Sequence, residues 1–258
     1  SWGTWRGPTI DLQRLFGDTA NSLTRVNVDA RRKATMMMIG DYYPYFWRNK
    51  GGFTATWDET NVAGATFACG TGANCVKHIV GNVEDHTAEY GSPSLRMATS
   101  LSTHLIRLAD IYLVYAEAVL GNNTETSDPE ALRLFNMVRK RSIPTAVDET
   151  SLTLEKIYKE RRLELACEGD NWYDFVRLHY YNPQLAKQWI NAQERGSYNN
   201  LQAFYKGEVT QDQVTINSFK ANLTDDSKFF LPFPDVDITM NKNLLEDPVP
   251  FDFNSIGY

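Results

Sequence analysis

Three glutamates recur at four-residue spacing in the segment EKIYKERRLELACEGD, which is the most catalysis-like pattern in the chain. Residues four apart lie on one face of a helix, so Glu160, Glu164 and Glu168 are expected to present their carboxylates together. Paired carboxylates can hydrolyse glycosidic bonds by acid–base catalysis. The alternative is a structural ion-pair lattice, and we favour it because charged partners are plentiful: Arg107, Asp110, Glu117, Arg139, Arg161, Arg162, Asp174 and Arg177.

A second group of residues with binding chemistry lies between positions 41 and 57. The segment DYYPYFWRNKGGFTATW holds seven aromatic residues, and four of the six tryptophans lie within the first 57 residues. A glycine-punctuated loop has no regular apolar face for burying rings, whereas exposed rings can stack on the C–H faces of sugars. The candidate ligand-binding residues are Trp2, Trp5, Tyr42, Tyr43, Tyr45, Trp47 and Trp57, with Arg48, Asn49 and Asp58 as polar partners for hydroxyl groups. The alternative is that many of these rings pin the loop to the rest of the protein.

The cysteines and histidines give no metal site. Cys69 and Cys75 lie in the glycine-rich stretch ACGTGANC, where they either close a small disulfide loop or remain free thiols. Cys167 is expected to be a core residue. His78 and His86 are close in sequence, but their spacing matches no zinc template. Neither a metal nor a cofactor is predicted.

The middle of the chain predicts consecutive helices. Residues 103–122 form a helix that is apolar on most sides, capped by Ser102 or Thr103, and therefore expected to be central. Residues 127–144 open with Asp-Pro-Glu, an N-cap followed by proline at the first helical position. The charged helix within 153–170 follows, and then an aromatic corner, NWYDF, whose Trp172 and Phe175 are expected to close over that helix.

The flanking regions are less regular. Glycines punctuate residues 1–101, which we interpret as loops with a short helix at 10–16 and short strands or turns at 34–39, 76–80 and 94–97. A helix is predicted from 183 to 195. Further along the chain, FFLPFP (residues 229–234) cannot be a helix or a central strand, because its prolines break both, so it is predicted to be an extended strap that docks on the core. The fold class is mainly α, with helical hairpins like those of tetratricopeptide proteins.

Several blocks of the sequence, in order, resemble the C-terminal half of the SusD/RagB family. They are RLADIYLVYAEAVL, ALRLFNMVRKR, ERRLELACEGDNWYDFVRL and FFLPFPDVDITMNKNLL, preceded by SWGTWRGPTIDLQRLF and DARRK. Two departures are Cys167, where the family usually has phenylalanine, and Asn241-Lys242-Asn243, which lacks the usual proline. On this resemblance, residues 1–258 are a single SusD-like region. It comprises a loop-rich, ligand-binding part (1–101), a helical core (102–181), and a helix with a C-terminal strap (182–258).

The resemblance implies a non-catalytic, surface-exposed component of an outer-membrane uptake system. Such a protein captures a glycan and passes it to a SusC-like TonB-dependent transporter. It also implies a signal and a lipid-bearing N-terminal cysteine upstream of the sequence given, so that the membrane is contacted only through that anchor. A glycoside hydrolase and a peptide-binding tetratricopeptide-like adaptor remain the alternatives.

Composition agrees with a globular protein. The chain has 258 residues, of which 42% are hydrophobic and 22% charged, and this length is sufficient for a sizeable core. Its net charge of -6 argues against a nucleic-acid-binding face. No apolar run approaches the length of a membrane-spanning helix.

Overall fold

The computed structural model of the chain describes residues 7–57, 70–94 and 98–247. It divides into two compact units, Ser1–Asn222 and Leu223–Tyr258. The secondary structure in the described ranges is mainly helical, with three two-stranded sheets. None of the helices in these ranges is both long enough and apolar enough to cross a bilayer.

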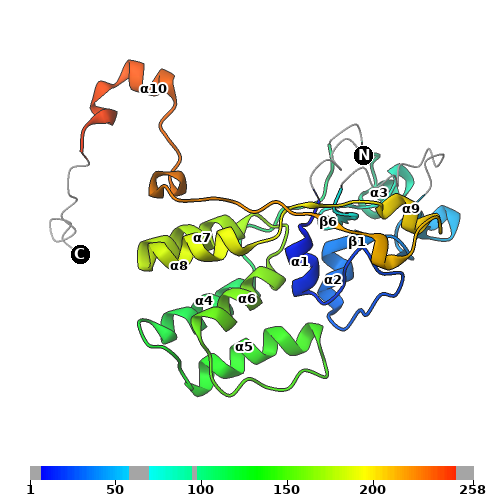
Figure 1. The fold of residues 1–258 in the computed structure, drawn as a ribbon, viewed down its shortest axis with the longest axis horizontal. Helices are drawn as coiled ribbons and strands as arrows, with labels where there is room; N and C mark the ends of the chain where they lie inside the picture. The colour runs from blue at the N-terminus through cyan, green and yellow to red at the C-terminus, as the bar shows by residue number, and fades with distance from the viewer. Residues whose placement is uncertain (1–6, 58–69, 95–97, 248–258) are drawn as a thin grey trace. The chain divides into compact units, whose positions relative to one another are not determined.

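Three helices build the helical core of the first unit (Figure 1). They are α4 (Leu108–Leu120), α5 (Pro129–Ser142) and α6 (Leu154–Glu164), and α4 packs against both of the others. Full burial of one large aliphatic side chain stabilises a fold by roughly 1.5–3 kcal/mol, so the apolar cluster between these helices is a major source of stability. Its buried members are Ala109, Leu113, Ala116, Leu120, Ala131, Phe135, Val138, Leu152 and Ile157.

Local capping explains where two of these helices begin. The Asp128 carboxylate accepts a hydrogen bond from the Ala131 amide at 2.8 Å, and Pro129 occupies the first turn of α5. The Thr153 hydroxyl accepts from the Lys156 amide at 3.3 Å at the start of α6. The predicted start of α5 is therefore confirmed.

The prediction for α4 was wrong in two respects. The helix begins at Leu108 rather than after Ser102 or Thr103, because Arg107 has an extended backbone (φ -122°, ψ 151°) while its guanidinium is bound to carboxylates of α6 and the following turn. One side of the helix is also open, since Leu108, Ile111 and Val114 are 64%, 49% and 41% exposed. The helix is therefore not packed on most sides.

The aromatic corner is itself helical. It forms α7 (Asp170–Tyr181), which packs against α8 (Pro183–Ala192), and the Asn182 side chain caps α8 by accepting from the Leu185 amide at 3.0 Å. Phe175 is buried as expected, but Trp172 is 40% exposed. Residues three apart are neighbours on a helix surface, so the two positions lie side by side and only Phe175 is covered by the rest of the protein.

The N-terminal part supplies short elements around small sheets. Helices α1 (Ile10–Leu15) and α2 (Ala30–Thr35) precede β1 (Met36–Met38), which pairs antiparallel with β4 (Ala73–Cys75). All three methionines of β1 are buried. Side chains from α1, from this sheet and from the end of α6 share one apolar cluster, which joins the sheet to the helical core: Leu12, Phe16, Met36, Met38, Ala73, Leu163 and Ala166.

The strand predicted at 76–80 is absent. The structure places the strand earlier, because His78 has a left-handed backbone (φ 67°) and the Ile79 amide closes a turn onto the Val76 carbonyl at 3.1 Å. Part of the expected element at 94–97 lies outside the described residues.

Short elements complete both units. In the first, β5 (Ser197–Tyr198) pairs with β6 (Ile216–Asn217), with α9 (Leu201–Tyr205) and the 3-10 helix η2 (Gln211–Gln213) between them. In the second, η3 (Asp226–Phe229) ends at the first residue of the FFLPFP strap. The rest of the strap, residues 230–234, has no regular structure and leads to α10 (Asp235–Met240) and then η4 (Lys242–Leu245). The predicted break in helical structure at this strap is confirmed.

Candidate functional site

The aromatic segment folds as a small hairpin. Strand β2 (Tyr42–Tyr43) pairs antiparallel with β3 (Phe53–Thr54), and the 3-10 helix η1 (Arg48–Lys50) lies at the tip. Successive strand residues point to opposite faces, so Tyr43 and Phe53 face inward and Tyr42 faces solvent. The hairpin rests on a buried cluster of its own: Met37, Tyr43, Phe53, Ala55 and Val76.

Three of the candidate rings have structural contacts. Tyr43 is 8% exposed and donates a hydrogen bond from its hydroxyl to the Lys33 carbonyl at 3.0 Å. The Trp47 ring packs edge-on against Phe53 with a centroid separation of 4.6 Å. The Trp57 ring stacks on Tyr205 at 5.8 Å. These contacts anchor the hairpin to two apolar clusters, as the structural interpretation of the aromatics anticipated.

Two rings are open to solvent. Tyr45 is 76% exposed and Tyr42 is 46% exposed. The Tyr42 hydroxyl donates to the Gly51 carbonyl at 2.8 Å, so its ring lies across the hairpin. Gly52 has φ 102°, and a Cβ there would lie within 2.5 Å of the Tyr42 hydroxyl, so a glycine is required under the ring.

A single carboxylate positions the hairpin tip. Asp85 lies in the first turn of α3 (Val83–Tyr90) and accepts hydrogen bonds from the backbone amides of Trp47, Arg48 and Asn82. Burial of the carboxylate raises its pKa, but these amides and the Arg48 guanidinium outweigh burial and hold the pKa of Asp85 below its ordinary value. The Asn49 side-chain oxygen accepts from the Asn82 amide group at 3.2 Å.

Seven of the ten candidate residues thus lie in the hairpin or directly after it, between positions 42 and 57. Tyr42, Tyr45, Arg48 and Asn49 are exposed, Trp47 and Trp57 are half-buried, and Tyr43 is buried. Trp2, Trp5 and Asp58 lie outside the described residues.

The glutamates of α6 and the following turn are engaged in ion pairs. Glu160 pairs with Arg31 at 2.6 Å, Glu164 with Arg107 at 2.8 Å, and Glu168 with Arg107 at 2.7 Å. Further pairs of this lattice are Glu160–Arg139, Glu164–Arg31, Glu164–Arg141, Glu168–Lys77, Arg161–Asp110 and Arg161–Asp174. The prediction of an ion-pair lattice is confirmed.

The charge states of these glutamates follow from their surroundings. Burial raises the pKa of Glu160 despite its pairing with Arg31. For Glu164, burial acts in the same direction, but hydrogen bonds from Arg107 and Arg141 prevail and lower its pKa. The pKa of Glu168 is likewise lowered, because Arg107 and Lys77 outweigh the effect of burial. Glu164 and Glu168 are therefore bound anions.

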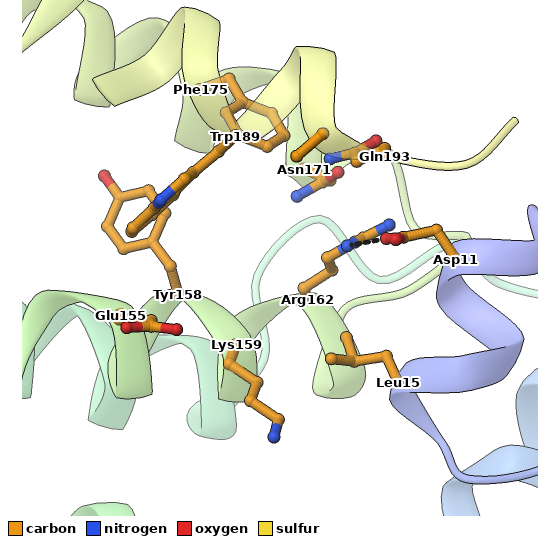
Figure 2. Close-up of a pocket in the computed structure, with 11 residues that line it drawn as sticks. Asp11, Leu15, Glu155, Tyr158, Lys159, Arg162, Asn171, Phe175, Trp189 and Gln193 are labelled. Carbon is orange, nitrogen blue, oxygen red and sulfur yellow. Dashed lines mark ion pairs between the residues drawn. The ribbon is translucent and has the colours of Figure 1, made fainter. Parts of the chain in front are cut away.

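A cavity of about 270 Å³ lies beside α6, and sequence reasoning missed it (Figure 2). Figure 2 shows the rings of Tyr158, Trp189 and Phe175 on one side of it, with the amides of Asn171 and Gln193 on the other. Arg162 pairs with Asp11 at 2.6 Å at the edge of this cavity. The sequence signal for this cavity was the four-residue spacing of Trp189 and Gln193, which places a ring and an amide side by side on the predicted helix.

The cavity combines rings with amides and charged groups. Trp189 and Tyr158 lie edge to face with centroids 5.7 Å apart, which fixes both rings. Such a combination suits a ligand that has both apolar faces and hydroxyl groups. The cavity is thus a second surface to compare with the hairpin tip.

Solved structures resemble the chain over almost its whole length. One, a crystal structure with xylogluco-oligosaccharide, is 29% identical and matches with a TM-score of 0.70, covering 96% of this chain and 47% of that one. A second crystal structure, also 29% identical, has a TM-score of 0.71 and covers 98% and 50%. A SusD-like protein from Bacteroides fragilis, at 22% identity and a TM-score of 0.55 over 91% and 45%, shares the fold.

Sequence comparison gives the same result. A SusD-like protein of Bacteroides ovatus is 32% identical over 270 residues, which cover 98% of this chain and 44% of the relative. The chain therefore spans less than half the length of this curated relative. Residues 12–249 match the sequence model of the SusD family. With these matches and its mainly helical fold, the chain belongs to the SusD family.

Proposed function

We propose that this chain captures a glycan without cleaving it, as part of an outer-membrane uptake system. The observation that carries the proposal is the match to the structure with xylogluco-oligosaccharide, at 29% identity over 96% of the chain. The chain spans less than half the length of the relative that carries this match, and the proposal concerns the binding that residues 1–258 provide.

The exposed hairpin tip is the proposed contact surface. Tyr42 and Tyr45 offer ring faces to sugar C–H groups, and the half-buried Trp47 adds an exposed part of its indole. Arg48 and Asn49 lie in η1 and can bind hydroxyl groups. Each ring contributes on the order of 1 kcal/mol, so binding by a single chain is weak.

The remaining candidate residues either support the hairpin or are proposed as contacts from the sequence alone. Tyr43 and Trp57 act mainly as supports, since their rings pack against other residues of the protein. Trp2, Trp5 and Asp58 remain proposed contacts on the strength of the sequence alone.

The charge arrangement supports a non-catalytic role. Hydrolysis of a glycosidic bond requires two carboxyl groups roughly 5–10 Å apart beside the bound sugar. The densest carboxylate cluster in the described part of the chain is instead bound by arginines and a lysine in the ion-pair lattice. These carboxylates support the fold, so a hydrolase is the weaker alternative.

The partner and the location are proposed from the family. The loaded protein transfers its glycan to a SusC-like TonB-dependent transporter at the cell surface. By analogy with the family, contact with the outer membrane is through a lipid anchor.

Affinity electrophoresis of the chain against plant, host and microbial polysaccharides tests the proposal. Retardation by one glycan class, with the glycan unchanged in size afterwards, is the expected result. Shortened glycan would support the hydrolase instead. Retardation by none of the glycans, together with binding of peptides, would support the tetratricopeptide-like adaptor.

A further inference from the structure

Strand β4 lies against the turn that follows α6, and contacts on both sides of Cys75 hold them together. Ala73 packs in the same buried cluster as Leu163 and Ala166. Lys77, two residues beyond Cys75, donates from its ammonium group to the Glu164 carbonyl at 3.0 Å and to the Glu168 carboxylate at 2.5 Å. The residues on both sides of Cys75 thus contact residues 163–168, so Cys75 lies next to this segment.

Cys167 lies within this segment. It has a left-handed backbone (φ 64°) in a turn closed by a hydrogen bond from the Glu168 amide to the Leu165 carbonyl at 3.1 Å. Its thiol lies close enough to that of Cys75 for each to shift the pKa of the other. Cys75 is half-buried and Cys167 is exposed, so reagents from solvent can reach the pair. The sequence prediction of Cys167 as a core residue was wrong, because the turn directs it outward.

We propose that Cys75 and Cys167 form a reversible disulfide that joins β4 to the turn after α6. The bond would link residues 92 positions apart in sequence (167 minus 75) and fasten the sheet beneath the hairpin to the helical core. It also excludes the Cys69–Cys75 loop, since Cys75 can form only one disulfide.

The local chemistry favours Cys75 as the first thiol to react. The interaction with Cys167 and the nearby Lys77 lower the pKa of Cys75 to about 7, although burial opposes them. The interaction with Cys75 raises the pKa of Cys167 instead. Near neutral pH, Cys75 is therefore the more readily deprotonated of the two thiols and attacks first, and Cys167 is the resolving thiol.

The reaction requires a disulfide donor such as oxidised glutathione. The Cys75 thiolate attacks one sulfur of the donor, forming a mixed disulfide and releasing one donor thiolate. Cys167 then loses its proton and attacks the Cys75 sulfur, releasing the second donor thiolate. Two protein thiols are oxidised by two electrons, the donor is reduced to two thiols, and the protons pass to the released thiolates.

Peptide mapping after incubation with oxidised glutathione tests the proposal. Trypsin places Cys69 and Cys75 in one peptide, residues 51–77, and Cys167 in another, residues 163–177. A Cys75–Cys167 bond joins these two peptides, whereas a Cys69–Cys75 bond leaves the first peptide separate and internally closed. We expect the joined pair, separated again by dithiothreitol.

The Cys69→Ser variant is the matched control. It should still lose the mass of two hydrogens on oxidation and lose both of its alkylatable thiols. Cys167→Ser should give no joined peptide. A Cys69→Ser protein that keeps both thiols, or wild-type chain in which 51–77 is only internally closed, would overturn the proposal.

Discussion

Replacing Glu164 by Gln tests whether the ion-pair lattice holds the helical core together. The Glu164 side chain is 1% exposed and pairs with Arg31, Arg107 and Arg141 at 3.2, 2.8 and 2.7 Å. Glutamine keeps the volume and removes the negative charge. Removing one partner of a buried ion pair costs about 3–5 kcal/mol. Arg31 and Arg107 keep other carboxylates and Arg141 is half exposed, so we expect the lower end, about 3 kcal/mol.

Differential scanning calorimetry measures this effect. For a folding unit of this size, 1 kcal/mol corresponds to about 2–4 °C in Tm, so Glu164→Gln should lower Tm by roughly 6–12 °C. Glu130→Gln is the control, because it removes the same charge from a solvent-exposed pair with Arg133. No measurable change is expected there, since water and salt screen such pairs. Equal Tm values for the two variants would refute the structural role of the lattice.

Two further predictions concern the stability of the helical core. Glu164 and Glu168 have pKa values below the ordinary 4.5, so their stabilisation is present above that pH and is lost as the pH falls through the folded-state pKa. Tm should therefore fall on acidification below about pH 5, and a flat profile would contradict this sign. Leu113→Ala, at a fully buried position of α4, should cost about 2–5 kcal/mol in urea denaturation, and a loss within experimental error would show that α4 does not anchor the core.

Local signals predicted the start of α5 but not that of α4. The Asp128-Pro129 start of α5 depends on neighbouring residues only, and both the cap and the proline act as expected. The start of α4 was misplaced because it depends on Arg107 binding Glu164 and Glu168, which are about 60 positions away. Contacts of this range leave no periodic signal in the sequence.

Ring orientation in the candidate site was not predictable to the same degree. Composition identified the aromatic segment, but the hairpin register decides that Tyr43 is buried and Tyr42 exposed. The position of η1 depends on Asp85, which lies in a helix not predicted from the sequence. The cavity beside Trp189 draws residues from α1, α6, α7 and α8, so no single segment indicates it.

Titration calorimetry with a xylogluco-oligosaccharide tests the central claim most directly. The chain should bind it, and Tyr45→Ala and Trp47→Ala should each weaken binding by roughly fivefold, corresponding to about 1 kcal/mol per ring. Trp189→Ala, which removes a ring from the cavity of Figure 2, should leave affinity unchanged. Loss of binding in Trp189→Ala alone, with both hairpin variants binding like the parent, would contradict the account and place the sugar in the cavity.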